Sequence, residues 1–306
     1  KAEYDEIWDR LRQSYFGFEH YFIERSALDD SPEERERELR TRYDDGGFGL
    51  WLGNYQDMFF VREANEAISE WVRERIKERV DDPDTAEKLT PHDHPFGTKR
   101  VPLESNYYEA FNRDNVELVD LKAAPIEEIT PTGLRTSDAE YEFDILVYAT
   151  GFDAMTGPLN KIDIRGRGGK LLRDKWSDGP RSYLGLTVAD FPNMFTITGP
   201  GSPSVLSNMP VSIEQHVEFI SRIISDMRER GVEVIEPTQQ AEDEWTAHSQ
   251  EVAHSTLLPQ SATWYMGANI PGKPRVFMPY LGGVGPYRQK CDEIAANDYE
   301  GFALKS

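Results

Sequence analysis

The chain has 306 residues, which is long enough for two domains or for one large domain with an insert. Hydrophobic residues make up 38% of it and aromatic residues 11%, a composition typical of a globular soluble protein and not of a disordered one. The balance of 34 basic and 55 acidic residues gives a net charge of −21, and a surface of that sign repels nucleic acid and anionic lipid, so we expect neither as a partner.

Residues 1–96 are predicted to be mostly helical. Ser31-Pro32-Glu33-Glu34 is typical of a helix start, with a hydroxyl cap, proline at the first position and acids in the first turn. Glu63–Val80 carries apolar residues at helical spacing, and Asp81-Asp82-Pro83-Asp84 ends that helix.

Residues 97–150 are predicted to form strands. Val116–Val119 has an extended pattern, and Ile126–Thr136 indicates a hairpin around Pro131-Thr132-Gly133. Phe143–Tyr148 ends in a continuous apolar run, which predicts a buried strand that leads directly into Ala149-Thr150-Gly151.

Residues 151–306 mix loops, strands and helices. Met194–Thr198 is predicted to be a short strand, followed by a loop rich in glycine, proline and serine at Gly199–Ser207. A helix is expected from near Pro210 until Gly231 stops it. No apolar run approaches the roughly 20 residues of a membrane span, and the single cysteine, Cys291, fits a reducing, cytoplasmic compartment.

Glycine-rich turns are present, but a complete dinucleotide-binding fingerprint is not. That fingerprint, G-x-G-x-x-G, lies between a strand and a helix. Four Gly-x-Gly pairs occur without the third glycine, at residues 47/49, 166/168, 199/201 and 283/285. These patterns alone predict a soluble α/β protein with glycine-rich loops and name no cofactor.

Longer strings carry a family resemblance. Residues 146–153 (LVYATGFD) resemble the ATG motif of flavoproteins with two dinucleotide-binding domains, although any Ala-Thr-Gly turn after a buried strand would look the same. More specific strings occur in order along the chain, namely HPFGTKR at 94–100, NYY at 106–108, GPGSPS at 199–204 and WYMGAN at 264–269. With them the chain resembles Baeyer–Villiger monooxygenases, which are class B flavoprotein monooxygenases, and among these most of all the phenylacetone enzyme.

The resemblance implies a fold and an activity. It implies an α/β chain that is the C-terminal part of a two-dinucleotide-binding-domain flavoprotein. Residues 1–96 would be a helical insert, 97–148 the end of the NADP-binding domain and 149–306 the end of the FAD-binding domain. The implied reaction uses FAD, NADPH and O2 to convert a ketone to an ester or lactone. The missing N-terminal half would be the partner that supplies both fingerprints.

Arg100 is the catalytic residue that the resemblance implies. Its guanidinium would stabilise the flavin peroxide that attacks the ketone, because an arginine stays charged at any working pH and can donate several hydrogen bonds. Without the resemblance, Arg100 would be a surface residue that makes weak ion pairs in an acidic protein.

Other residues are implied to bind the cofactors or the substrate. Lys99 would contact the 2′-phosphate of NADPH, and Trp264 would contact its nucleotide; the alternatives are a solvated lysine and a core tryptophan. Thr150 and Gly151 would pass close to a cofactor. In the loop before the helix at Pro210, Asn208 and Met209 would lie beside the flavin, with substrate contacts from Val205, Leu206 and Met209; the alternative is an ordinary connection.

The same residues leave two alternative functions open and argue against two more. Another class B monooxygenase, oxidising nitrogen or sulfur, would share most of these strings. The chain by itself could instead be a non-catalytic fragment. A metal site at His92 and His94 lacks further ligands at suitable spacing, and no G-x-S-x-G elbow supports a hydrolase, so we expect no metal and no serine nucleophile.

Overall fold

The computed structural model describes residues 3–306, and its first part is helical, as predicted. The helices there are α1 (Tyr4–Gln13), α2 (Pro32–Asp44), the short α3 (Gly49–Leu52), α4 (Arg62–Lys77) and α5 (Pro83–Leu89). Ser31 caps α2 in a complete capping box, and the Asp82 side chain caps α5. The helix start predicted at Ser31 is confirmed, because capping satisfies N–H groups that have no partner inside the helix. Residues 81–84 were predicted only to end the preceding helix, and the structure adds that Asp82 starts the next one.

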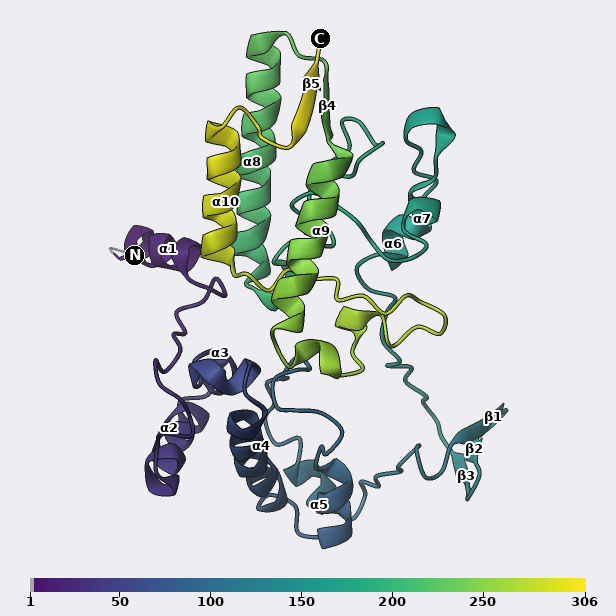
Figure 1. Ribbon diagram of the computed structural model, residues 1–306. Helices are drawn as coiled ribbons and strands as arrows, with labels where there is room; N and C mark the ends of the chain where they lie inside the picture. The colour runs from purple at the N-terminus through teal and green to yellow at the C-terminus, as the bar shows by residue number, and fades with distance from the viewer. Residues whose placement is uncertain (1–2) are drawn as a thin grey trace.

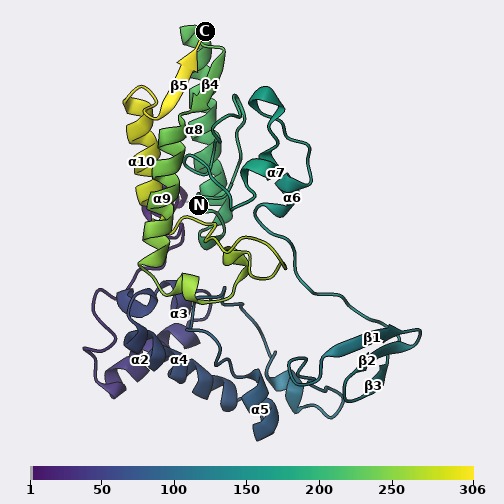
Figure 2. The ribbon, with the colours of Figure 1, turned by 45° about the vertical axis from the view of Figure 1, so that its right-hand side comes forward.

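A small three-stranded sheet follows and stands apart from the helices (Figure 1; Figure 2). It consists of β1 (Ile126–Thr130), β2 (Gly133–Thr136) and β3 (Glu140–Glu142), paired antiparallel in that order. The predicted hairpin is therefore confirmed. Glycine is needed at position 133, because an added Cβ would lie 1.8 Å from the carbonyl oxygen of Tyr141 on the neighbouring strand.

The last part of the chain contains the longest helices. They are α8 (Met209–Arg230), α9 (Gln239–His254) and α10 (Val284–Ala296), with the short α6 (Gly157–Asn160) and α7 (Leu172–Lys175) preceding them. Both ribbon views place α8, α9 and α10 together, with the two-stranded sheet of β4 (Val234–Pro237) and β5 (Phe302–Lys305) at one end (Figure 1; Figure 2). The predicted stop of α8 is confirmed, since Gly231 takes the left-handed conformation there.

Two large apolar cores hold the molecule together. One lies among α8, α9, α10 and the β4–β5 sheet. The other joins the N-terminal helices to segments of the C-terminal part, and it contains Trp51 and Ile68 together with Leu206, Tyr265 and Phe277. Residues far apart in the chain therefore share one core. Within residues 3–306, no helix has the length and apolar character that crossing a membrane requires.

Three strand predictions were wrong. Val116–Val119, Phe143–Tyr148 and Met194–Thr198 form no strand. The second was expected to be buried, yet Ile145 is 79% exposed and Val147 77%. A strand exists only when neighbouring strands take up its backbone hydrogen bonds, and no described residue pairs with this segment. The apolar pattern indicated the character of the segment, but a partner decides its structure.

Candidate functional site

The loop before α8 lies at the centre of the predicted site. Residues 204–206 form a single 3₁₀ turn, with Ser204 at a φ of +39°, and α8 begins at Met209. The Ser207 hydroxyl donates to the carbonyl oxygen of Ser204 at 2.7 Å, and a hydrogen bond of 2.6 Å joins it to the Ser212 hydroxyl in α8. These buried bonds hold the loop against the helix, so its side chains have set positions.

Arg100 reaches this loop from a distant part of the sequence. Its Nη1 donates to the carbonyl oxygen of Val205 at 3.3 Å. The side chain is exposed, and among the described residues no carboxylate forms an ion pair with it. The positive charge at the loop is thus available to other groups.

Lys99 is placed differently from its neighbour Arg100. Its Nζ lies 3.5 Å from Oδ2 of Asp93, which is also 3.6 Å from Nζ of Lys122. The hydrogen bond with His94, followed by the two lysine charges, holds the pKa of Asp93 well below its usual range. Lys99 is therefore part of a surface charge cluster. No group of three or more possible metal ligands occurs in the described part of the chain.

Trp264 lies on a short turn at residues 264–266 and is half-buried. Its ring is 4.4 Å from that of Tyr265, centroid to centroid. Tyr265 is fully buried with no hydrogen-bond partner for its hydroxyl among the described residues. Burial raises the pKa of Tyr265 to about 12, and the charge of Arg100 opposes this shift. Sequence reasoning missed Tyr265, although it follows Trp264 directly.

Thr150 and Gly151 are exposed, and no hydrogen bond joins either of them to the loop at residues 204–209 in the described part of the chain. Gly151 has a φ of +86°, but a Cβ there would meet nothing within 4 Å, so the conformation alone accounts for the glycine in this chain. The next residues connect to the turn after Trp264. Asn269 Nδ2 donates to the carbonyl oxygen of Phe152 at 2.9 Å, and Lys273 Nζ to Asp153 at 2.6 Å.

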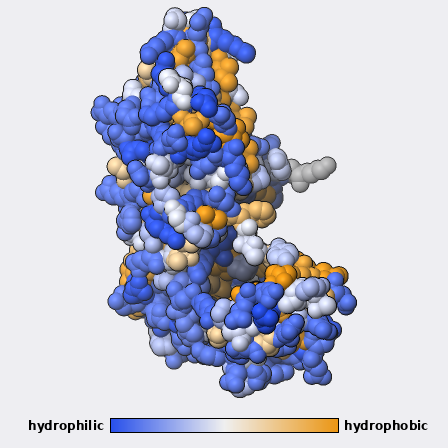
Figure 3. Space-filling view, turned by 90° about the vertical axis from the view of Figure 1, so that its right-hand side faces the viewer, coloured by the Kyte–Doolittle hydropathy of each residue, from blue (hydrophilic) through white to orange (hydrophobic). Residues whose placement is uncertain are grey.

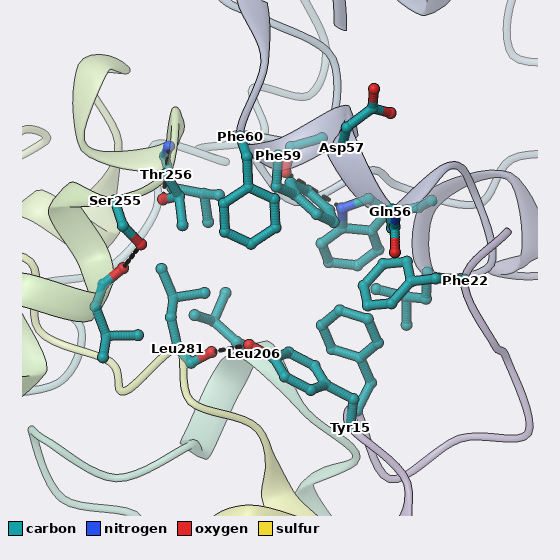
Figure 4. A pocket seen from close by; sticks show the side chains of 16 residues that line it. Tyr15, Phe22, Gln56, Asp57, Phe59, Phe60, Leu206, Ser255, Thr256 and Leu281 are labelled. Carbon is teal, nitrogen blue, oxygen red and sulfur yellow. Dashed lines mark hydrogen bonds between the residues drawn. The ribbon is translucent and has the colours of Figure 1, made fainter. Parts of the chain in front are cut away.

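Two hollows flank the loop. One, of about 430 Å³, is lined by Val205, Met209 and residues of the preceding segment that include Phe195, Thr198 and Gly199. The other, of about 500 Å³, is lined by Leu206 and by aromatic residues from the N-terminal part (Figure 4), namely Tyr15, Phe16, Phe22, Trp51, Phe59 and Phe60. We call the second one the apolar pocket. The structure thus separates Leu206 from Val205 and Met209, which the sequence grouped together.

Most polar side chains that line the apolar pocket have their polar groups hydrogen-bonded within the protein. The hydroxyl of Tyr15 donates to the carbonyl oxygen of Leu281. Ser255 and Thr256 donate to carbonyl oxygens of their own helix end, at 2.8 and 2.7 Å. Asp57 accepts from Ser26 and Ala27. With these groups already paired, the pocket suits a neutral, apolar molecule.

His216 is a buried residue of α8 that sequence reasoning did not identify. Its Nδ1 accepts the N–H of Thr198 at 3.0 Å, beside the hollow at Met209, and its Nε2 has no partner among the described residues. Thr198 has a φ of +55°, so this bond supports a strained backbone position. Burial lowers the pKa of His216 to about 4.

This low pKa predicts a pH-dependent stability. Between pH 6.5 and about 4, the unfolded chain binds a proton that folded His216 refuses, so its contribution to the free energy of unfolding falls as the pH drops through that range. The full loss is on the order of 3 kcal/mol. His216→Asn, which keeps an acceptor for Thr198, should show a smaller loss in urea titrations across this range. Parallel curves for the two proteins would contradict the assignment.

The space-filling view shows a face hollowed at mid-height, with apolar side chains gathered below the hollow (Figure 3). The segment between β3 and α6 also exposes apolar side chains. They include Ile145, Val147, Tyr148 and Phe152, the last of which is 88% exposed. An apolar surface of this kind is typical of a contact region.

Comparisons with known proteins agree along nearly the whole chain, although no family model matches. The chain is 45% identical over 303 residues to a Baeyer–Villiger monooxygenase of Pseudooceanicola batsensis, covering 98% of this chain and 54% of that protein. It is 43% identical to an acetone monooxygenase (methyl acetate-forming) of Gordonia sp., covering 99% and 57%. It is also 42% identical to the phenazine N-monooxygenase PhzNO1 of Lysobacter antibioticus, covering 100% and 56%.

Solved structures agree with the fold. The chain superimposes with a TM-score of 0.96 and 41% identity on OTEMO in complex with FAD and NADP, covering 99% of this chain and 56% of that one. The TM-score is also 0.96, with 42% identity, for cyclohexanone monooxygenase from Rhodococcus sp. Phi1 bound to NADP⁺, covering 100% and 57%. The α/β fold class is therefore confirmed. The chain is thus similar to Baeyer–Villiger monooxygenases along nearly its whole length, and it spans little more than half the length of the relatives it matches.

Proposed function

We propose that the protein to which this chain corresponds oxidises ketones to esters or lactones, with FAD, NADPH and O2. The observation that carries the proposal is the hydrogen bond from Arg100 to the carbonyl oxygen of Val205, which brings a free positive charge to a loop between two hollows. Arg100 stabilises negative charge that develops on oxygen during the reaction. Relatives of the chain are named for ketone oxidation, and two of the matching solved proteins are complexes with FAD and NADP or with NADP⁺.

The residues present fit one end of FAD. The N-terminus of α8 opens at Met209 onto the 430 Å³ hollow, and Asn208 makes no side-chain cap, so N–H groups of the first turn are free to bind an electron-rich ring edge. FAD would supply the oxygen chemistry, and NADPH its electrons. Asn208 and Met209 hold the flavin, Thr150 and Gly151 pass beside a cofactor, and Lys99, Arg100 and Trp264 contact NADPH.

The substrate is assigned to the neighbourhood of the same loop. Val205 and Met209 contact the substrate from the 430 Å³ hollow and Leu206 from the apolar pocket, which suits the hydrocarbon part of a ketone. Gln56 in that pocket donates its backbone N–H to the carbonyl oxygen of Ile23, while its side-chain amide has no hydrogen bond to a described residue and can orient a carbonyl group. In domain terms, residues 1–96 form a helical insert, 97–148 the end of the NADP-binding domain and 149–306 the end of the FAD-binding domain.

The decisive assay compares a ketone with an amine on the complete protein. Ester formed from a ketone such as cyclohexanone or phenylacetone supports the proposal. N-oxide formed instead, with no ester, would support the second candidate, N-oxidation, which the similarity to a phenazine N-monooxygenase favours.

Lys99→Ala should lower the preference of the complete enzyme for NADPH over NADH. A lysine ammonium on the 2′-phosphate contributes to NADPH affinity alone, so KM for NADPH should rise about tenfold with little change for NADH. Lys122→Ala, which removes the other lysine near Asp93, is the matched control. Equal KM changes for the two cofactors would place Lys99 outside the cofactor site.

The chain by itself should bind no flavin tightly and turn over no ketone. None of its four Gly-x-Gly turns has the third glycine, so the turn that grips the cofactor pyrophosphate is lacking in this sequence. The absorbance spectrum of the purified 306-residue chain, incubated with FAD and desalted, measures this. A yellow, flavin-loaded sample would contradict the expectation.

A further inference from the structure

A short segment, residues 14–17, caps the N-terminal ends of two helices at once; we call it the strap. The carbonyl oxygen of Phe16 accepts the N–H of Asn208, just before α8, at 2.8 Å. The carbonyl oxygens of Tyr15 and Ser14 accept the N–H groups of Val284 and Gly285, in the first turn of α10, at 2.8 and 3.2 Å. These N–H groups have no partner inside their helices, so the strap satisfies them.

The side chains of the strap line the apolar pocket. The rings of Tyr15 and Phe16 are 4.9 Å apart, and that of Phe16 is 5.4 Å from Phe22, in edge-to-face arrangements. All three residues line the pocket, as Leu206 does; Figure 4 labels Tyr15, Phe22 and Leu206 around it. Phe16 therefore has its ring in the pocket wall and its carbonyl oxygen on Asn208.

Gly17 lets the strap backbone pass close to Asn208. It has a φ of +71°, and a Cβ built on it would lie 2.9 Å from the Cβ of Asn208 and 3.4 Å from that of Val211. The backbone of the strap thus rests against Asn208. Because the carbonyl oxygen of Phe16 accepts the N–H of Asn208 at 2.8 Å and no room for a side chain is left at Gly17, a shift of Phe16 is expected to move Asn208 as well.

We propose that the strap couples the apolar pocket to residues 204–209, so that the size of a neutral apolar molecule in the pocket sets the position of Asn208 and Met209. The strap residues are positioning residues, because they act through Asn208. The inference rests on the proposed function only for what Asn208 and Met209 do; the coupling is a property of this chain and is measured without turnover.

The first test follows Prodan, a neutral fluorescent naphthyl ketone, on the full chain. Prodan should bind with a blue-shifted emission, since the pocket is apolar. Its binding should change the exchange rate of the Asn208 amide, which donates to Phe16, measured by residue-resolved hydrogen–deuterium exchange. Absence of Prodan binding, or binding that leaves the Asn208 amide unchanged, would overturn the coupling.

The second test uses two glycines with the same backbone conformation. Gly17→Ala and Gly46→Ala both place alanine at a φ near +70°, but a Cβ at position 46 meets nothing within 4 Å. Gly17→Ala should weaken Prodan binding by about fivefold relative to Gly46→Ala, because its methyl group displaces the strap. Equal affinities would refute the proposal.

A double variant protects this test against simple loss of folding. Asn208→Gly removes the Cβ that the new methyl group of Gly17→Ala would meet. The double variant should therefore bind Prodan with the same affinity as Asn208→Gly. The circular dichroism spectra of these two variants should also be the same. If the double variant instead binds Prodan more weakly than Asn208→Gly does, the effect of Gly17→Ala does not pass through Asn208 and the proposal fails.

Discussion

Replacing Arg100 by alanine in the complete enzyme is expected to abolish ester formation while oxidation of NADPH continues. Arg100 supplies a permanent charge at the loop, bound to the carbonyl oxygen of Val205 and free of any carboxylate among the described residues. A methyl group cannot stabilise negative charge on oxygen, and loss of one such donor lowers the rate about 100-fold or more. Electron transfer from NADPH does not require that charge, so the two activities should separate.

Gas chromatography of the ester, run together with absorbance of NADPH, measures the separation. Arg100→Lys should keep part of the ester yield, since it retains the charge and loses the planar fork of donors. Arg228→Ala is the matched control: Arg228 is an exposed arginine in the last turn of α8, at the opposite end from Met209. Unchanged ester yield in Arg100→Ala would remove Arg100 from the mechanism.

Lys175→Ala is expected to lower the free energy of unfolding strongly, because it removes one partner of a buried ion pair. Lys175 Nζ lies 2.8 Å from Oε2 of Glu242, with side chains only 6% and 0% exposed. The other oxygen of Glu242 accepts the N–H of Ala189 at 2.8 Å, and Lys175 donates to the carbonyl oxygen of Ala189 at 2.7 Å. Removing the lysine leaves a buried carboxylate without its counter-charge, at a cost of about 3–5 kcal/mol.

Urea unfolding of the full chain, followed by circular dichroism, tests this expectation. Lys170→Ala removes an ion pair of similar length, 2.7 Å to Asp190, in which both side chains are about half exposed. That variant should change the free energy of unfolding by about 1 kcal/mol or less, because water screens the pair. Similar losses in the two variants would mean that the Lys175–Glu242 pair is solvated.

Local signals in the sequence predicted local structure well. The cap at Ser31, the stop at Gly231 and the turn before Gly133 each depend on residues only a few positions apart. Backbone conformation and nearby hydrogen bonds determine such features, so a single sequence contains the information. The resemblance to Baeyer–Villiger monooxygenases followed from ordered strings of residues, and the comparisons confirm that resemblance.

Predictions that depended on distant partners were wrong or incomplete. The run at Phe143–Tyr148 has the apolar pattern of a buried strand, but no described strand lies beside it and it stays exposed. Apolar pattern indicates that a segment can be buried; the neighbours that bury it are elsewhere in the chain or outside it. The placement of Leu206 on a different hollow from Val205 and Met209 was equally out of reach.

The sequence by itself determined the resemblance to Baeyer–Villiger monooxygenases, the helix start at Ser31, the helix stop at Gly231, the hairpin and the candidates Arg100 and Met209. Only the tertiary structure decided that Arg100 reaches the carbonyl oxygen of Val205, that His216 supports Thr198, and that residues 14–17 join the apolar pocket to α8. These contacts link residues that lie between 18 positions apart, for Thr198 and His216, and 271 positions apart, for Ser14 and Gly285. Such contacts depend on how the whole chain packs, whereas caps and turns depend on adjacent residues.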